Sequence, residues 1–166
     1  MCPMRRDPWR KLGESLADRF AARAQGLSAT EFVLLDREGT EIGRLELHGT
    51  AGAELRAGDV EARIERVGRS GYKMFSLSAE ILTSTGDATS PAITYLNHPY
   101  ETSLSLLRNK AEAGPVKHTT TIHIKGGLTN RNYETSFDPS DEGSLPVAFF
   151  LLYRLVSQRR EAYRTG

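Results

Sequence analysis

Residues 145–156 read LPVAFFLLYRLV. Ten of its twelve residues are apolar, and Pro146 suits the first turn of a helix. Arg154 arrives too early for a membrane span, which needs about 17 to 25 such residues. A helix that is apolar on every side must be surrounded by protein. We therefore predict a buried helix over residues 145–160, with a structural core made of Leu145, Val147, Phe149, Phe150, Leu151, Leu152 and Leu155.

The chain before this helix alternates apolar and polar residues with a period of two. The pattern is clearest in residues 60–65, 116–125 and 132–137. Weaker strands are predicted near residues 31–36, 41–48, 71–77, 79–83, 92–96 and 101–107. Short strands separated by Gly, Pro, Asn and Asp turns are typical of an antiparallel barrel or sandwich.

The buried helix sets the width of the predicted barrel. A helix with its side chains is about 10 to 12 Å across, whereas a barrel of about eight strands is filled by its own side chains. Residues 29–144 allow about ten to twelve strands at roughly 8 to 12 residues per strand and turn. We predict a mainly β (α+β) domain, a closed antiparallel barrel of about ten to twelve strands around the helix. The alternative is a sandwich with the helix packed on one face.

The first 28 residues predict an amphipathic helix outside the barrel. Asp7 suits an N-cap, Pro8 the first helical position and Gly26 the C-cap. An apolar stripe with spacings of three and four connects Trp9, Leu12, Leu16, Phe20 and Ala24. The predicted organisation is a helical extension over residues 1–28, followed by a barrel domain over residues 29–166.

The net charge of +1 is divided unevenly along the chain. Residues 1–28 carry six basic and three acidic residues, and residues 154–166 carry four and one, so each end has a balance of +3 and the remainder −5. Basic segments attract anionic lipid and other phosphate surfaces. The candidate lipid or phosphate contacts are Trp9, Arg10, Lys11, Arg19, Arg23, Arg159 and Arg160. The alternative is that these are solvated faces of terminal helices.

Residues 32–43, FVLLDREGTEIG, combine a hydrophobic strand, an Asp-x-x-Gly turn and a second strand. Together with the apolar helix near the end, they resemble the tubby C-terminal-like superfamily, which includes LURP-one-related proteins and phospholipid scramblases. The resemblance covers residues 30–160 and implies a barrel of about twelve strands around a central hydrophobic helix. No stretch matches the acidic calcium segment of scramblases, and Cys2 alone cannot match their palmitoylated Cys-rich segment. The lipid-binding basic residues of tubby proteins have no positional counterpart here.

No catalytic motif or phosphate-binding loop is present in the sequence, and one cysteine excludes a disulfide framework. His118 and His123 are five residues apart, so on one strand they face opposite ways and cannot share a metal. His48 and His98 lie at a strand end and in a turn, with no Cys or carboxylate at the spacing that we expect of ligands. We therefore expect no enzymatic activity, no cofactor and no metal.

The preferred hypothesis is a non-catalytic binding protein that contacts anionic phospholipid or a phosphorylated partner. The lack of a signal segment or a long apolar run predicts a cytoplasmic protein, peripheral to the membrane where it binds lipid. The acidic body argues against nucleic acid as a partner. Two alternatives stay open: a hollow barrel that carries or converts a small ligand, and a protein-interaction module that uses the stripe from Trp9 to Phe20.

Overall fold

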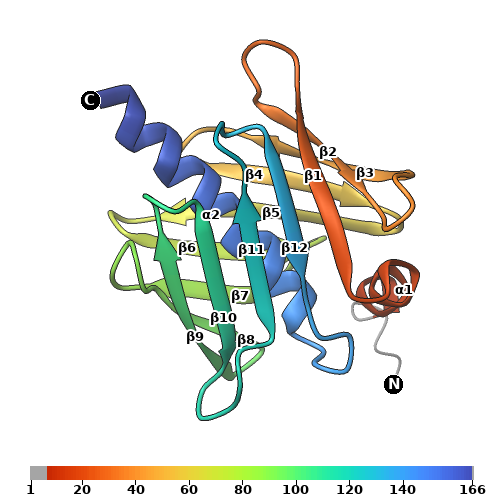
Figure 1. Ribbon diagram of the computed structural model, residues 1–166. Coiled ribbons are helices and arrows are strands. Elements are labelled where there is room, and N and C mark those ends of the chain that lie inside the picture. The colour runs from red at the N-terminus through yellow and green to blue at the C-terminus, as the bar shows by residue number, and fades with distance from the viewer. Residues whose placement is uncertain (1–6, 166) are drawn as a thin grey trace.

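The computed structural model describes residues 7–165, which form two helices and twelve strands (Figure 1). The helices are α1 (Asp7–Leu16) and α2 (Ser144–Thr165). The strands are β1 (Arg19–Gln25), β2 (Glu31–Leu35), β3 (Glu41–Leu47), β4 (Gly52–Ala57), β5 (Val60–Val67), β6 (Gly71–Ser76), β7 (Ala79–Thr85), β8 (Ala92–Tyr95), β9 (His98–Ser105), β10 (Lys110–Pro115), β11 (Ile122–Gly126) and β12 (Asn132–Ser136).

The strands form one closed antiparallel barrel, which confirms the predicted fold class. Each strand pairs with its neighbours in sequence, and β1 pairs with β12, with Phe20 opposite Thr135, to close the ring. In such a meander, successive turns lie at alternate ends of the barrel. The turns after β1, β3, β5, β7, β9 and β11 share one end with the C-terminal part of α2, which we call the exit end. The other end, where α1 lies, is called the capped end.

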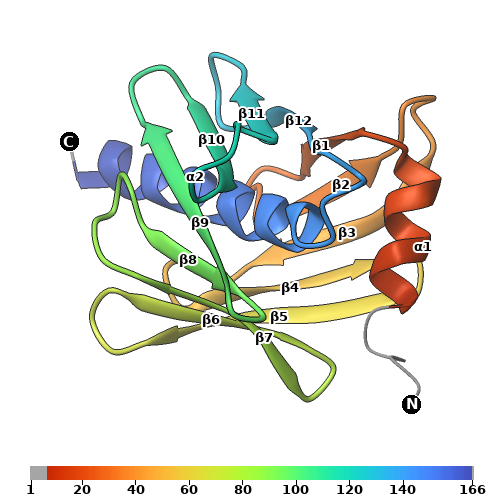
Figure 2. The same cartoon turned by 90° about the horizontal axis from the view of Figure 1, so that it is seen from below.

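Helix α2 runs through the barrel and fills it (Figure 2). Apart from Pro146 and Arg154, every residue from Leu145 to Val156 is at most 4% exposed. Phe149 stacks on Phe20 of β1 with ring centroids 4.5 Å apart, and Phe150 meets Tyr72 of β6 at 6.0 Å. Because α2 packs against well-separated strands, the barrel is plugged. The sandwich and the hollow barrel are therefore wrong, and α2 extends to Thr165 where the sequence predicted residue 160.

Helix α1 closes the capped end. Trp9, Leu12 and Leu16 are buried, and the Trp9 indole lies 6.2 Å from the Phe149 ring. Its Nε1 also donates a hydrogen bond of 3.1 Å to the Ser76 hydroxyl at the end of β6. Thus α1 is held in place both by apolar contact with α2, the helix that plugs the barrel, and by a polar contact with the barrel wall.

The prediction that the first helix continues to Gly26 is wrong. Helix α1 ends at Leu16, and Arg19–Gln25 forms strand β1. Phe20 and Ala22 point into the core, at 1% and 0% exposure, while Arg19 and Arg23 face solvent. A spacing of four fits both a helix and a strand, since four is close to 3.6 and is also a multiple of two. The pairing of β1 with β12 and β2 decides for the strand. Residues 1–28 are therefore not a separate extension, because part of them completes the barrel.

Two further boundaries differ from the predictions. Residues 116–121 lie between β10 and β11, so the predicted single strand begins only at Ile122. Strands β4 and β10 were not predicted, because Ala, Gly, Glu and Lys dominate them and carry weak strand propensity. The Asp-x-x-Gly turn is confirmed: Asp36 Oδ1 accepts the amides of Glu38 and Thr40, and Gly39 has a φ of 82°.

Neither α1 nor the described part of α2 is long and apolar enough to cross a membrane.

Candidate functional site

Side chains of α2 from Tyr153 onward form hydrogen bonds with the loops of the exit end. Tyr153 donates a 2.7 Å hydrogen bond to the Gly49 carbonyl in the β3–β4 turn. Gln158 Nε2 donates to the Ala88 carbonyl in the β7–β8 loop at 2.8 Å. The β3–β4 turn and the β7–β8 loop are therefore both bonded to α2.

Arg159 and Arg160 belong to this loop-holding set. Arg159 is buried and donates to the Leu106 carbonyl and to Asn130 Oδ1, the latter at 2.6 Å. Arg160 donates to the Ala29 and Asn130 carbonyls and lies 5.2 Å from the centre of the Phe32 ring. Burial lowers the pKa of Arg160. The structure thus places these two predicted lipid contacts against protein carbonyls.

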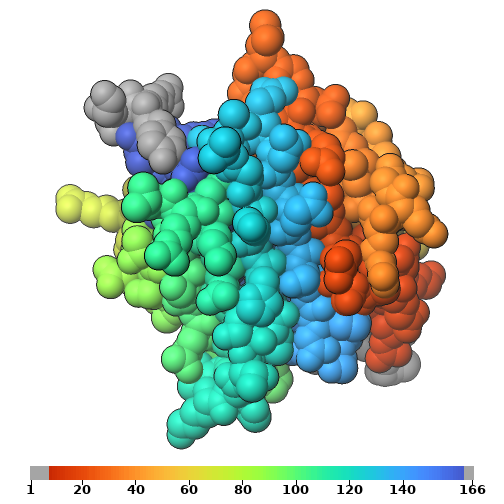
Figure 3. Space-filling view, viewed as in Figure 1, coloured from red at the N-terminus to blue at the C-terminus, as the bar shows by residue number. Residues whose placement is uncertain are grey.

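Three leucines at the exit end are almost fully exposed. Leu27, Leu107 and Leu128 are 104%, 88% and 101% exposed. They lie in the β1–β2, β9–β10 and β11–β12 loops, which follow one another around the rim because β1, β12, β11, β10 and β9 are consecutive in the barrel. Figure 3 shows the β1–β2 loop projecting beyond the rest of that face. Scattered exposed leucines are common, but neighbouring loop tips that all carry one form a candidate contact surface.

The exit end is positively charged. Its turns carry Arg69, Arg108 and Arg131 against Asp87. Residues 154–162 of α2 add three arginines, Arg154, Arg159 and Arg160, against Glu161, which gives this end a net charge of +4.

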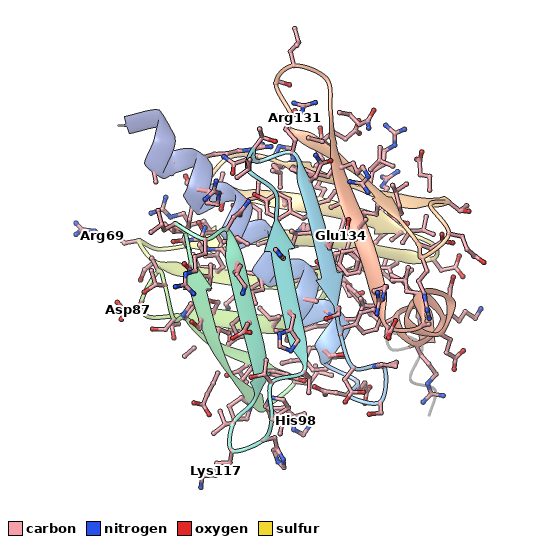
Figure 4. The ribbon with its side chains drawn as sticks, viewed as in Figure 1. Arg69, Asp87, His98, Lys117, Arg131 and Glu134 are labelled. Atoms are coloured by element: carbon pink, nitrogen blue, oxygen red, sulfur yellow. The ribbon has the colours of Figure 1, made fainter. Side chains whose placement is uncertain are left out.

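The capped end is negatively charged. Its turns carry only Arg37 and Lys117 against seven acidic residues, and α1 adds two basic and two acidic residues, so the net charge is −5. The seven are Asp18, Asp36, Glu38, Asp59, Asp138, Asp141 and Glu142. Figure 4 shows Arg69 and Arg131 toward the exit end and Lys117 and His98 at the opposite end. The fold therefore separates charge along the barrel axis.

An open pocket of about 390 Å³ lies at the exit end between α2, the β5–β6 turn and the β7–β8 loop. Its charged lining residues are Arg66, Arg69, Arg154, Asp87 and Glu161. Its lining hydroxyls come from Thr50, Ser70, Tyr72 and Ser84. The pocket therefore offers arginine and hydroxyl donors with a small excess of positive charge.

Arg154 is the central cation of this pocket. Its guanidinium lies 4.3 Å from the centre of the Tyr72 ring and donates to the Tyr72 hydroxyl at 3.1 Å and to Ser157 at 3.0 Å. Among the side chains that the structure describes, no carboxylate forms an ion pair with it. A half-buried arginine without a counter-ion is suited to bind an anion, because charges removed from water are normally paired.

Ser84 provides a second unused group in the same pocket. It is 3% exposed, and its hydroxyl makes no hydrogen bond to any described residue. The hydroxyl lines the open pocket, where it can donate a hydrogen bond to a ligand oxygen.

The other predicted contacts lie elsewhere. Lys11 is 3.9 Å from Asp59, Arg19 is 3.3 Å from Asp18, and Arg23 Nη2 is 3.5 Å from Glu134. Arg10 lies on α1 at the acidic, capped end. Trp9 is 5% exposed and packed on the plug. The structure therefore brings these residues neither onto one helix face nor together with Arg159 and Arg160.

The prediction that the apolar stripe from Trp9 to Phe20 forms a protein-interaction surface is wrong. All four side chains are at most 5% exposed: Trp9, Leu12, Leu16 and Phe20. Sequence reasoning missed Leu27, Leu107, Leu128, Arg66 and Arg154 as surface or pocket residues. Two of the leucines follow glycines in turns, as Gly26-Leu27 and Gly127-Leu128, and a large apolar residue in a turn is a signal that could have identified them.

The fold defines a class: a closed twelve-stranded antiparallel barrel filled by its C-terminal helix. No protein-family model matches the chain, and no curated protein matches its sequence. An X-ray structure of a protein from Arabidopsis thaliana, AT5G01750, superposes with a TM-score of 0.56 at 10% sequence identity. The match covers 87% of this chain and 91% of that chain. At this identity the likeness shows a shared fold.

Proposed function

We propose that this protein binds the surface of anionic membranes through the exit end of the barrel. The observation that carries the proposal is the set of three almost fully exposed leucines, Leu27, Leu107 and Leu128, on adjacent loops of the cationic end. Apolar side chains on loop tips can enter the boundary between headgroups and acyl chains, while cations around them contact the headgroups.

The energies of such contacts are sufficient for reversible binding. Transfer of a leucine side chain from water to an apolar phase contributes about 1.5 to 3 kcal/mol. Each arginine near an anionic surface adds about 1 kcal/mol, and this part is screened by salt. Three leucines with several arginines therefore suffice for peripheral attachment.

The pocket beside α2 supplies a place for one lipid headgroup. Arg154 and Arg66 line it, and neither forms an ion pair with a described side chain. A guanidinium can bind a phosphate with two parallel hydrogen bonds. Ser84 lines the same pocket, and its hydroxyl adds a donor for a phosphate or carboxylate oxygen. A headgroup in this pocket would also offset the excess of positive charge there.

A membrane is favoured over a phosphorylated protein partner by the leucines. A phosphopeptide would need the arginines, but it gives no reason for apolar side chains at three separate loop tips. The cytoplasmic leaflet carries the anionic lipid that this surface requires. We therefore propose a cytoplasmic protein that is peripheral to the membrane.

The proposal includes membership of the tubby C-terminal-like superfamily. It is supported by the β2–β3 hairpin with its Asp36–Gly39 turn and by the barrel of twelve strands around an apolar helix. The Arabidopsis structure supports the same architecture.

Vesicle co-sedimentation of the full chain at low and moderate salt tests the proposal. We expect binding to phosphatidylcholine vesicles that contain phosphatidylserine, no binding to phosphatidylcholine alone, and weaker binding as salt rises. The double variant Arg66→Gln/Arg154→Gln should weaken binding, whereas Lys117→Gln removes a cation at the opposite end and should leave it unchanged. Equal binding to both vesicle types, or no binding to either, would overturn the proposal. Binding to phosphopeptides without binding to vesicles would favour the phosphorylated partner.

A further inference from the structure

A second group of chemically active side chains lies on the outer face of the β3–β4 hairpin, away from the pocket. It consists of Glu46, His48 and Glu54, all exposed. Glu46 and Glu54 are directly opposite each other in the register of β3 and β4. His48 Nε2 lies 3.2 Å from Glu54 Oε2, and one ligand atom from each of the three residues lies within 4.8 Å of the other two.

The register of the neighbouring strands concentrates negative charge at this place. Glu31 of β2 is opposite Glu46, and Glu46 is opposite Glu54, so three carboxylates stand side by side across β2, β3 and β4. Like charges in directly opposite positions destabilise a sheet. Arg44 pairs with Glu31 at 2.9 Å, but Glu46 has no ion pair or hydrogen bond with a described side chain. Among the described side chains, no cation therefore neutralises Glu46, the middle one of the three carboxylates.

The arginines nearest to this group are occupied by other partners. Arg44 also bonds Glu41 at 3.1 Å. Arg63 of β5 stands opposite Glu54, but it pairs with Glu65 and donates to the Leu77 carbonyl. Neither arginine neutralises Glu46.

We propose that Glu46, His48 and Glu54 bind a divalent transition-metal ion, with Zn²⁺ as the best match. Imidazole nitrogen and carboxylate oxygen are ordinary zinc ligands, at about 2.0 to 2.2 Å, whereas Ca²⁺ and Mg²⁺ prefer oxygen alone. Ligands around a tetrahedral zinc are about 3.3 Å apart, so the exposed side chains need only small rotations to reach that separation. Two carboxylates and a neutral imidazole also match the charge of the ion. Three protein ligands leave a coordination position for water.

The backbone places the three ligands before the metal binds. The His48 amide donates to the Gly52 carbonyl at 2.9 Å. The adjoining turn is tied to the plug by the bond from Tyr153 to the Gly49 carbonyl. Because the hairpin belongs to the closed barrel, little backbone order has to be gained on binding.

The chain contains a matched control. His123 Nδ1 lies 3.2 Å from Glu112 Oε2 on the outer face of β10 and β11, the same separation as in the first pair. In the described part of the chain no third ligand completes that pair. A surface histidine next to a glutamate is therefore present twice, and only one copy has the second carboxylate.

Isothermal titration of the full chain with ZnCl₂, in a Cys2→Ser background that removes the thiol, tests the site. We expect one ion per chain, and His48→Asn and Glu46→Gln should each weaken binding at least about tenfold. His123→Asn should leave it unchanged. Co²⁺ bound at this site should show the visible absorption of a four-coordinate cobalt ion, and His48→Asn should abolish this absorption. All three positions are exposed, so thermal unfolding should show that the variants remain folded.

Two results would overturn the proposal: no Zn²⁺ binding by the native site, or binding that His48→Asn and Glu46→Gln leave unchanged. Binding that His123→Asn reduces as much as His48→Asn would show ordinary surface histidine binding and would also overturn it. The site does not depend on membrane attachment, so each proposal can fail without the other.

Discussion

The two ends of the barrel use the same strands and opposite chemistry. At the capped end, large apolar side chains such as Trp9 and Leu16 are buried, and the turns are acidic. At the exit end, Leu27, Leu107 and Leu128 stand in solvent, and the turns and the helix that leaves the barrel carry arginines. Burial of Trp9 and Leu16 stabilises the fold, but exposure of three leucines does not. The difference separates the end that holds the protein together from the end that is available for contact.

The pockets at the two ends also differ. The capped end has a pocket of about 390 Å³, the same size as the one beside α2. Its charged lining residues are Arg10, Glu14, Asp141 and Glu142, and the Asp141 carboxylate already accepts the Tyr100 hydroxyl at 2.8 Å. Volume therefore does not distinguish the two pockets, whereas the sign of the charge of their lining residues does.

The largest expected effect on stability comes from the plug. Phe149→Asp places an unpaired charge at a position with 0% exposure, between the Trp9 and Phe20 rings. The cost exceeds what a domain with about 5 to 15 kcal/mol of stability can bear, so the variant should not fold. Circular dichroism and soluble yield measure this. A soluble, folded Phe149→Asp protein would contradict the plugged barrel.

At the capped end, Trp9→Ala should destabilise by about 3 to 5 kcal/mol, because a large buried aromatic is lost. Its hydrogen bond to Ser76 is lost as well. Chemical denaturation gives the value, and Trp9→Phe, which keeps most of the packing, is the control. The folded Trp9→Ala protein should still bind anionic vesicles. Loss of vesicle binding at full stability would mean that the capped end is the contact surface.

A smaller effect is expected for the Tyr100–Asp141 contact. Tyr100→Phe should cost about 1.5 to 3 kcal/mol at neutral pH, since a hydrogen bond to a charged group is lost. Burial, and then the bond to Asp141, raise the pKa of Tyr100 above its ordinary value of 10. This contribution is therefore complete below pH 10 and is lost as pH rises through the higher pKa of the folded state. Urea unfolding from pH 8 to 11 should show that the stability of Tyr100→Phe declines less steeply than that of the native chain. An equal decline would mean that Tyr100 does not contribute to the pH dependence.

The smallest effect on stability is expected at the exit end. Replacing Leu27, Leu107 and Leu128 together by Ser should change the free energy of unfolding by no more than about 0.5 kcal/mol per site, because these side chains are already in water. Thermal and chemical unfolding measure the change. A loss of several kcal/mol would show that the leucines pack on the barrel after all.

Much of the architecture could be predicted from local pattern. The run around Phe149 fixes a buried helix, and the alternation of the middle segment fixes a barrel wide enough to hold it. Strand β1 could not be predicted, because Leu16 and Phe20 fit both periods and the decision lies with Thr135 and its neighbours, more than a hundred residues away.

The candidate site was less accessible to sequence reasoning. Arg154 and Arg159 are close in sequence and both basic, but Arg159 bonds Asn130 and the Leu106 carbonyl, whereas Arg154 faces a pocket. Only the fold shows which arginine donates to a loop carbonyl and which lines a pocket. In the same way, Glu46 and His48 are two residues apart, but Glu54 joins them only across the hairpin.

Vesicle co-sedimentation of the Leu27→Ser/Leu107→Ser/Leu128→Ser variant shows whether the exit end is the membrane-binding surface. Leu77→Ser is the matched control, because Leu77 is 62% exposed in a turn at the opposite end. We predict that the native chain and Leu77→Ser bind vesicles containing phosphatidylserine, and that the triple variant, although equally stable, does not. Native-like binding by the triple variant, or equal loss in Leu77→Ser, would contradict it.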